Sequence, residues 1–182
     1  MLSDADRKLI EAASEAIRLR YRQDWQEVGA ALRLRSGKVF TGVSLDAYLG
    51  RMAVCAEAVA LGQAVTQGEG GIDTIAAVRH PAPGEKSRDI VVVSPCGACR
   101  ELLWDYDRNA RVIVPGPGGP QSVLIVDQVN YQREYVRMYA RRNNAGVDSY
   151  NGGLFVIALW WEWSPQSLAR NIHHARRHPS RS

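Results

Sequence analysis

The feature that most constrains this chain is the placement of its three cysteines. Cys96 and Cys99 stand three residues apart, directly after Pro95. The remaining cysteine, Cys55, stands two residues before Glu57. In a helix, positions i and i+3 lie on the same face, and the backbone N–H groups of the first turn are free. The spacing therefore predicts two sulfurs that converge just off one helix N-terminus, with the third sulfur supplied by a second helix N-terminus.

Three thiolates that meet at one point are suited to zinc. Zn²⁺ prefers sulfur and imidazole ligands in a tetrahedral arrangement, at about 2.3 Å for sulfur. Three protein ligands leave the fourth corner open to water, as in catalytic rather than structural sites. Two helix N-termini, each equivalent to roughly +0.5 of a charge, would offset the excess negative charge of the thiolates. Glu57 lies close enough to Cys55 in the sequence to reach the open corner and carry a proton there.

The pattern Cys55-Ala56-Glu57, followed about forty residues later by Pro-Cys-Gly-Ala-Cys-Arg-Glu from Pro95 onward, resembles the cytidine deaminase superfamily. Within it, the chain is most similar to small enzymes of the three-cysteine zinc type, the cytidine and blasticidin S deaminases. The resemblance covers roughly residues 3–126. It implies that Cys55, Cys96 and Cys99 hold Zn²⁺, that water activated there attacks C4 of a cytosine, and that Glu57 transfers the protons.

The resemblance also implies residues that bind the substrate. Ser44 and Asp46 stand where cytidine deaminases carry Asn-x-Glu, the pair that binds the ribose, with the same spacing of eleven residues to the first cysteine ligand. Both depart from that pattern, which leaves room for a modified sugar, and an ordinary polar loop is the competing interpretation. Ser94 and Pro95 would line the leaving-group side of the pocket. Ala56, between the ligand and the glutamate, is a further substrate-binding candidate.

The order of the expected elements predicts the fold class. Ser3 and Asp6 match a capping box ahead of a helix over 4–20. Alternation and apolar runs bounded by turn residues predict strands over 25–34, 39–43, 72–78, 90–93, 111–114 and 122–126, and helical spacing predicts helices over 54–68 and 96–106. The fold expected from this order, and implied by the resemblance, is an α/β protein: a three-layer α/β/α sandwich with a five-stranded mixed sheet.

The C-terminal part of the chain extends past the resemblance. We expect a deaminase domain over 1–126 and an extension over 127–182 that contains a helix, an apolar aromatic segment over 154–163 and a basic tail. The formal net charge of the chain is +4, and no acidic residue follows Glu162, so four arginines of the tail account for that excess. This distribution predicts a solvated tail rather than a nucleic-acid-binding face. By resemblance, an aromatic residue of the extension such as Phe155 is a candidate lid over the active site.

Composition narrows the cellular setting. The longest apolar run falls far short of the roughly 20 residues that span a bilayer, and the first residues lack the apolar core of a signal peptide. We therefore expect no membrane partner. Cysteines in metal-ligand spacing favour a reducing compartment, so we expect a cytoplasmic protein. The resemblance implies a homotetramer.

Three functions compete. The leading one is zinc-dependent hydrolytic deamination of a free cytosine nucleoside, cytidine or deoxycytidine, to the uracil nucleoside and ammonia. The first alternative is the same reaction on a cytosine-containing antibiotic such as blasticidin S. The second is a non-catalytic, zinc-stabilised binding module. A closed zinc site would need a fourth ligand, and the only histidine ahead of the tail, His80, stands in a segment that predicts an exposed loop.

Overall fold

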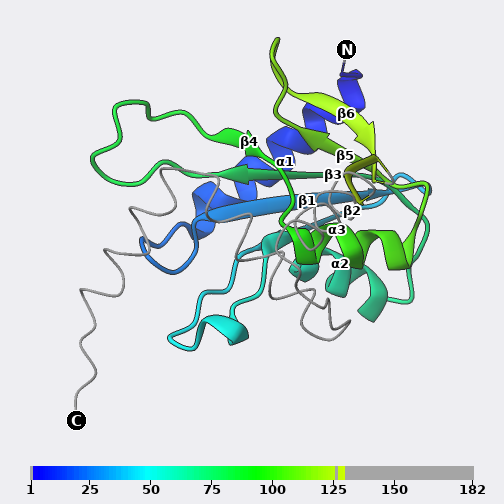
Figure 1. The fold of residues 1–182 in the computed structure, drawn as a ribbon, viewed down its shortest axis with the longest axis horizontal. Coiled ribbons are helices and arrows are strands. Elements are labelled where there is room, and N and C mark those ends of the chain that lie inside the picture. The colour runs from blue at the N-terminus through cyan, green and yellow to red at the C-terminus, as the bar shows by residue number, and fades with distance from the viewer. Residues whose placement is uncertain (1, 126, 130–182) are drawn as a thin grey trace, which may run out of the picture.

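The computed structural model describes residues 2–125 and 127–129 (Figure 1). Helix α1 spans Asp4–Arg20, as the sequence predicts. Ser3 accepts a hydrogen bond from the backbone N–H of Asp6, and the Asp6 carboxylate accepts one from the backbone N–H of Ser3, each at 3.1 Å. These two bonds confirm the expected capping box, which satisfies two of the free N–H groups at the helix start.

Six strands form one mixed sheet: β1 (Val28–Leu34), β2 (Val39–Val43), β3 (Ile72–Arg79), β4 (Val91–Val93), β5 (Arg111–Val114) and β6 (Gln121–Leu124). The sheet is five strands wide, in the order β2-β1-β3-β5-β6, and β4 also pairs with β3. Because β4 has only three residues, it pairs with one end of β3 and leaves the preceding residues of the same edge for β5. The expected fold class is confirmed, and the sheet has six strands rather than five, because the short strand predicted over 90–93 forms as β4 and pairs with β3.

Helices cover both faces of the sheet (Figure 1). Helix α1 packs on one face, and helices α2 (Ala56–Thr66) and α3 (Gly97–Tyr106) lie over the other. Successive residues of β1 point to opposite faces. Ala30 and Leu32 belong to the core under α2 and α3, whereas Ala31 belongs to the core under α1. The alternation produces two separate cores, one on each side of the sheet.

Two glycines set the distance between the sheet and the helices. A Cβ atom at Gly29 would lie 2.5 Å from the carbonyl oxygen of Ala13 in α1. A Cβ atom at Gly42 would lie 2.6 Å from the carbonyl oxygen of Ala56 and from the backbone nitrogen of Ala60 in α2. No side chain fits at such distances without a backbone shift. Gly42 therefore lies directly behind the start of α2.

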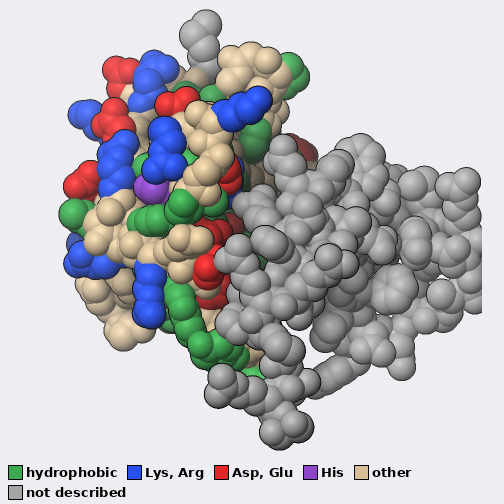
Figure 2. Space-filling view, turned by 90° about the vertical axis from the view of Figure 1, so that its left-hand side faces the viewer, with side chains coloured by type: hydrophobic (Ala, Val, Ile, Leu, Met, Phe, Trp, Pro, Cys, Tyr) green, Lys and Arg blue, Asp and Glu red, His purple; other side chains and the backbone are tan. Residues whose placement is uncertain are grey.

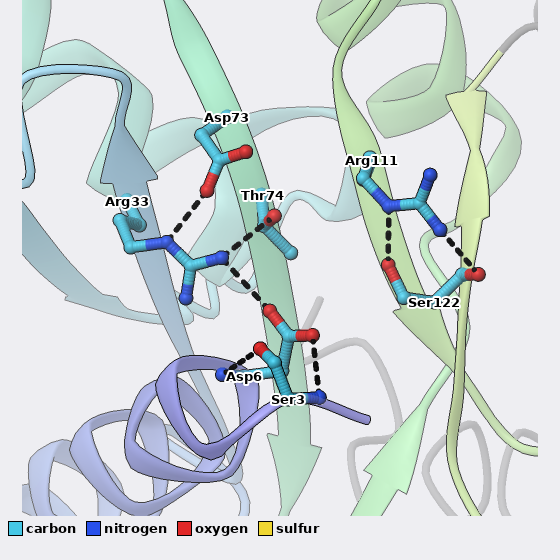
Figure 3. Close-up of polar contacts among 7 residues, drawn as sticks. All are labelled: Ser3, Asp6, Arg33, Asp73, Thr74, Arg111 and Ser122. Atoms are coloured by element: carbon cyan, nitrogen blue, oxygen red, sulfur yellow. Dashed lines mark hydrogen bonds and ion pairs between the residues drawn. The ribbon is translucent and has the colours of Figure 1, made fainter. Parts of the chain in front are cut away.

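An arginine anchors α1 to the sheet (Figure 3). Arg33 on β1 donates from Nε to Asp73 at 2.6 Å and from Nη2 to Asp6 at 2.8 Å and Thr74 at 3.1 Å. Burial alone would raise the pKa of Asp6, but the hydrogen bonds from Arg33 and Ser3 outweigh burial and lower that pKa. Burial would likewise lower the pKa of Arg33, and its bonds to Asp6 and Asp73 raise it instead. The ionised forms of this cluster therefore favour the folded state.

Several element ends differ from the sequence-based expectation. The first strand begins at Val28, not at residue 25, because residues 22–26 form a tight turn in which Trp25 donates to the Arg22 carbonyl and Asp24 has a positive φ of 62°. The last strand ends at Leu124, not at residue 126, because the backbone becomes helical at Ile125. The side chain of Ile125 is fully buried in the core under α2 and α3.

The charges of the described fold are mixed on the surface. Figure 2 shows basic and acidic side chains interspersed on the face that it presents, rather than gathered by sign. Within residues 2–125 and 127–129, no helix is both long and apolar enough to cross a membrane. The helix, aromatic segment and basic tail expected in the C-terminal extension lie outside the described residues.

Candidate active site

All three cysteines lie at the N-termini of α2 and α3. Cys55 is the N-cap of α2, Cys96 is the N-cap of α3, and Cys99 lies in the first turn of α3. Their three sulfur atoms lie within 4.8 Å of one another. The structure therefore brings together the three residues that the sequence predicts as ligands, and in the described part of the chain they are the only such cluster of histidine, cysteine and acidic side chains.

The local backbone explains this convergence. Both N-cap cysteines have extended conformations, with φ and ψ of −67° and 149° at Cys55 and of −68° and 172° at Cys96. The sulfur of Cys96 accepts a hydrogen bond from the backbone N–H of Cys99 at 3.4 Å. A sulfur thus takes the place of the usual N-cap oxygen. The positive ends of the two helices favour negative charge on these sulfurs.

The thiol chemistry suits a bound cation. The Cys55 and Cys96 sulfurs are 3.5 Å apart. Hydrogen bonds from the thiols of Cys55 and Cys99 lower the pKa of Cys96 to about 2. The same contacts raise the pKa of Cys55 to about 12, chiefly through its bond to Cys96, and also raise that of Cys99. Because the three sulfurs lie so close together, ionising all of them is unfavourable without a cation between them. A divalent cation would bind all three as thiolates, so the donor set fits zinc.

Glu57 lies in the first turn of α2, two residues after Cys55, and its side chain is buried, with 6% of the residue surface exposed. Burial raises the pKa of this carboxyl group to about 7, and the negative charge at Cys96 acts in the same direction. A pKa near the working pH is what a group that takes up and returns a proton requires. The arrangement thus supports the acid–base role that the sequence predicts for Glu57.

The other residues predicted to bind substrate next to the cysteines are Ala56, Ser94 and Pro95. Ala56 is fully buried in the core beneath α2. Ser94 is half-buried and Pro95 is buried, in the short segment that joins β4 to Cys96. Their positions beside Cys55 and Cys96 are compatible with roles at the pocket wall, and those roles stay predictions.

The pair predicted to bind the sugar makes hydrogen bonds of its own. The Ser44 hydroxyl accepts from the backbone N–H groups of Glu27 at 3.3 Å and Val28 at 3.2 Å. Asp46 is exposed, and its carboxylate accepts from the adjacent N–H of Ala47 at 2.8 Å. Ser44 therefore holds the start of β1, and Asp46 holds the turn of its own loop. This placement makes both less available to a ribose than the sequence suggests.

One aromatic contact and one backbone bridge lie in the segments around residues 25 and 45–54, ahead of Cys55. Trp25 is half-buried and meets Tyr48 edge-on with ring centroids 5.4 Å apart. The segment that leads to Cys55 is closed at its base by paired backbone hydrogen bonds between Leu45 and Val54. Tyr48 at the outer part of this segment is 81% exposed, so the Trp25 contact lies at the protein surface.

His80 begins a loop, as the sequence predicts, but the residue itself is less exposed than expected. The imidazole is half-buried and stacks on Tyr21 with ring centroids 3.9 Å apart. Its Nδ1 lies 2.9 Å from the carbonyl oxygen of Pro81. The backbone N–H of His80, directly after β3, donates to the carbonyl oxygen of Glu27. His80 is not part of the cysteine cluster, so among the described residues no fourth ligand closes the site.

Sequence reasoning missed two residues that shape the site. Gly42 permits the close approach of α2, and Arg100 in the first turn of α3 is buried, with 3% of its surface exposed. The Nε of Arg100 donates to the carbonyl oxygen of Pro95 at 3.0 Å. The sequence could have indicated Arg100, because a residue four positions after Cys96 lies on the same helical face as Cys96.

Comparisons with known proteins agree with this geometry. Residues 3–114 match the family of the cytidine and deoxycytidylate deaminase zinc-binding region. The chain is 47% identical over 113 residues to blasticidin-S deaminase of Bacillus cereus, covering 62% of this chain and 81% of that protein. The fold is similar to crystal structures of cytidine deaminases from Burkholderia pseudomallei (29% identity, TM-score 0.54, 69% of this chain and 95% of that chain) and Bacillus anthracis (17% identity, TM-score 0.60, 76% and 97%).

Proposed function

Because the chain belongs to the family of the cytidine and deoxycytidylate deaminase zinc-binding region, we propose that it hydrolyses the exocyclic amino group of the cytosine base of a free nucleoside. Water adds its oxygen to C4 of the base, the C4–N bond breaks, and the products are the uracil nucleoside and ammonia. The observation that carries the proposal is the group of three cysteine sulfurs within 4.8 Å of one another, at helix N-termini. The buried carboxyl group of Glu57 accompanies them.

The ligands are Cys55, Cys96 and Cys99. When bound, zinc supplies Lewis acid activation of a water nucleophile. The chain contributes the positions of the three sulfurs, and α2 and α3 contribute the positive ends of their dipoles. Since the described residues provide no fourth ligand to this cluster, a zinc ion held by these three thiolates would have one coordination position open to water, as in catalytic sites.

Glu57 moves the protons. Its carboxylate accepts a proton from the attacking water, delivers it to N3 of the base, and assists the departure of ammonia. A buried group with a pKa near 7 can act as base and then as acid within one turnover. Such a group contributes roughly 10²–10⁴-fold to the rate. Ser94 and Pro95 line the side where the amino group leaves, and Ala56, between the ligand Cys55 and Glu57, is a further proposed substrate-binding residue.

The sugar distinguishes two substrates. Cytidine or deoxycytidine needs residues that hydrogen-bond the ribose hydroxyls. The Ser44 hydroxyl and the Asp46 carboxylate already accept hydrogen bonds from nearby backbone N–H groups, so they are less available to a ribose. The similarity to blasticidin-S deaminase of Bacillus cereus favours the second candidate, a cytosine nucleoside antibiotic such as blasticidin S. Both candidates share the base, and therefore the same chemistry at C4.

The test is the ultraviolet absorbance of zinc-loaded protein mixed in turn with cytidine, deoxycytidine and blasticidin S. Loss of the cytosine band with any of the three supports deamination and identifies the sugar class. The Glu57→Gln variant, run beside it, should leave the band unchanged over the same time. Zinc-loaded protein that changes none of the three but binds RNA would instead support a zinc-stabilised binding module.

The remaining expectations complete the proposal. The protein is proposed to be a cytoplasmic homotetramer. Sedimentation of the purified chain measures its oligomeric state. The chain is proposed to divide into a deaminase domain over residues 1–126 and an extension over 127–182, in which Phe155 or a neighbouring tryptophan is the candidate lid. Truncation after Ala145 should then raise KM, whereas unchanged activity and affinity would remove the lid from the account.

A further inference from the structure

A buried arginine lies directly beside the cysteine pair of α3. Arg100 follows Cys99 in the sequence and is almost entirely excluded from solvent. The reaction proposed above gives it no task. Burying a charged group is unfavourable unless it is hydrogen-bonded and paired, so the position of this guanidinium requires a local explanation.

Arg100 holds both peptide groups that flank Cys96. Its side-chain Nε donates to the carbonyl oxygen of Pro95, on the peptide before Cys96, at 3.0 Å. Its backbone N–H donates to the carbonyl oxygen of Cys96, on the peptide after it, also at 3.0 Å. Because peptide groups are planar, their orientations on either side of a Cα determine φ and ψ of that residue. These two angles set the direction in which the Cβ of Cys96 leaves the backbone.

We propose that Arg100 is a positioning residue for the metal site. Its Nε hydrogen bond orients the Pro95–Cys96 peptide so that the Cys96 sulfur points at the sulfurs of Cys55 and Cys99. Groups that orient metal ligands from behind typically contribute 10–100-fold to metal affinity or activity, so removing this bond should weaken zinc binding by roughly that factor. Arg100 acts through Cys96 and does not contact the substrate.

Three substitutions separate the hydrogen bond from the charge. Arg100→Gln keeps an N–H donor at the same number of bonds from the backbone as Nε, without the charge. Arg100→Lys keeps the charge but has a carbon atom at that point, and Arg100→Met keeps neither. If the hydrogen bond positions Cys96, the glutamine variant retains zinc affinity and the lysine and methionine variants lose it. If only the charge matters, the lysine variant retains affinity and the glutamine variant loses it.

The experiment is competition for zinc between each metal-free variant and a chromophoric chelator. We expect zinc affinity within about threefold of wild type for Arg100→Gln, and a loss of roughly 10–100-fold for Arg100→Lys and Arg100→Met. The cobalt(II) absorption spectrum, which reports the geometry of the sulfurs around the metal, should change in the two weakened variants alone. These readouts do not depend on catalysis.

Arg33→Met is the matched control, since Arg33 is a largely buried arginine on the opposite face of the sheet. It should lower the thermal stability of the metal-free protein and leave zinc affinity unchanged. The proposal is overturned if all Arg100 variants bind zinc like wild type, or if glutamine is as weak as methionine while lysine is normal. Should Arg100→Met fail to fold, the comparison of glutamine with lysine decides the question.

Discussion

The two faces of the sheet use the same packing device for different ends. On one face, α1 approaches the sheet over Gly29, and on the other, α2 approaches it over Gly42. Under α1, the buried charges of Asp6 and Arg33 pair with each other. Over the opposite face, the thiols and the carboxyl group of Glu57 gather at helix N-termini with raised or lowered pKa values. The ion pair under α1 stabilises the fold, whereas the cysteines and Glu57 over the other face are groups with shifted pKa values that can take part in the reaction.

The largest expected effect is on the reactive face, at Glu57. Glu57→Gln keeps the size of the side chain but cannot take up a proton, so kcat/KM should fall by roughly 10²–10⁴-fold. Zinc content, measured by metal analysis, should stay at one per chain. Thermal stability should not fall, because a neutral amide replaces a buried carboxyl group. Normal turnover by this variant would remove Glu57 from the mechanism.

The corresponding change on the opposite face is Arg33→Met. It leaves the Asp6 carboxylate without its buried partner, and breaking such a pair costs roughly 3 kcal/mol or more of folding free energy. Chemical denaturation measures the loss. The folded fraction should keep its kcat/KM, since the cluster lies under α1 and the cysteines lie over the other face. A large fall in kcat/KM of folded protein would show that the two faces are coupled.

The two glycines provide a matched pair. Gly29→Ala and Gly42→Ala each force a helix backbone away from the sheet, and overpacking of this kind typically costs about 1–3 kcal/mol. Only Gly42→Ala displaces the start of α2, next to Cys55 and Glu57. Chelator competition should therefore show weaker zinc binding for Gly42→Ala and unchanged binding for Gly29→Ala. Equal effects on zinc would contradict the division between the faces.

The smallest effect concerns pH. The folded-state pKa of Asp6 lies below its ordinary value of about 3.8. The ionised carboxylate therefore contributes stability that is fully present above that value and is lost as the pH falls through the folded-state pKa. Asp6→Asn should be less stable than wild type at pH 7, and the difference should shrink at acid pH. Denaturation midpoints at pH 7 and pH 3 test this; a difference that does not change with pH would show that the carboxylate charge is not responsible.

Local signals accounted for much of the fold and of the site. The capping box at Ser3 and Asp6 placed the start of α1, because both partners are three residues apart. The cysteine spacing indicated the metal cluster, because helix geometry relates i to i+3. In each case the interacting groups are close in the sequence, so the physics could be evaluated without knowing the rest of the chain.

The features that were missed depend on contacts between distant residues. The bonds from Ser44 to Glu27 and Val28 exist only because β1 and β2 pair. The stacking of His80 depends on Tyr21, more than fifty residues earlier. The role of Gly42 depends on the approach of α2, which its own neighbours in the sequence do not indicate.

The most direct test of the central claim is a zinc titration of metal-free protein with deaminating activity measured at each step. The substrate is whichever of cytidine, deoxycytidine or blasticidin S loses its cytosine absorbance, and Glu57→Gln is titrated in parallel. The account predicts that activity rises in proportion to zinc and saturates at one zinc per chain, while the variant binds the same amount of zinc and stays inactive. Activity without zinc, or equal activity in the variant, would contradict it.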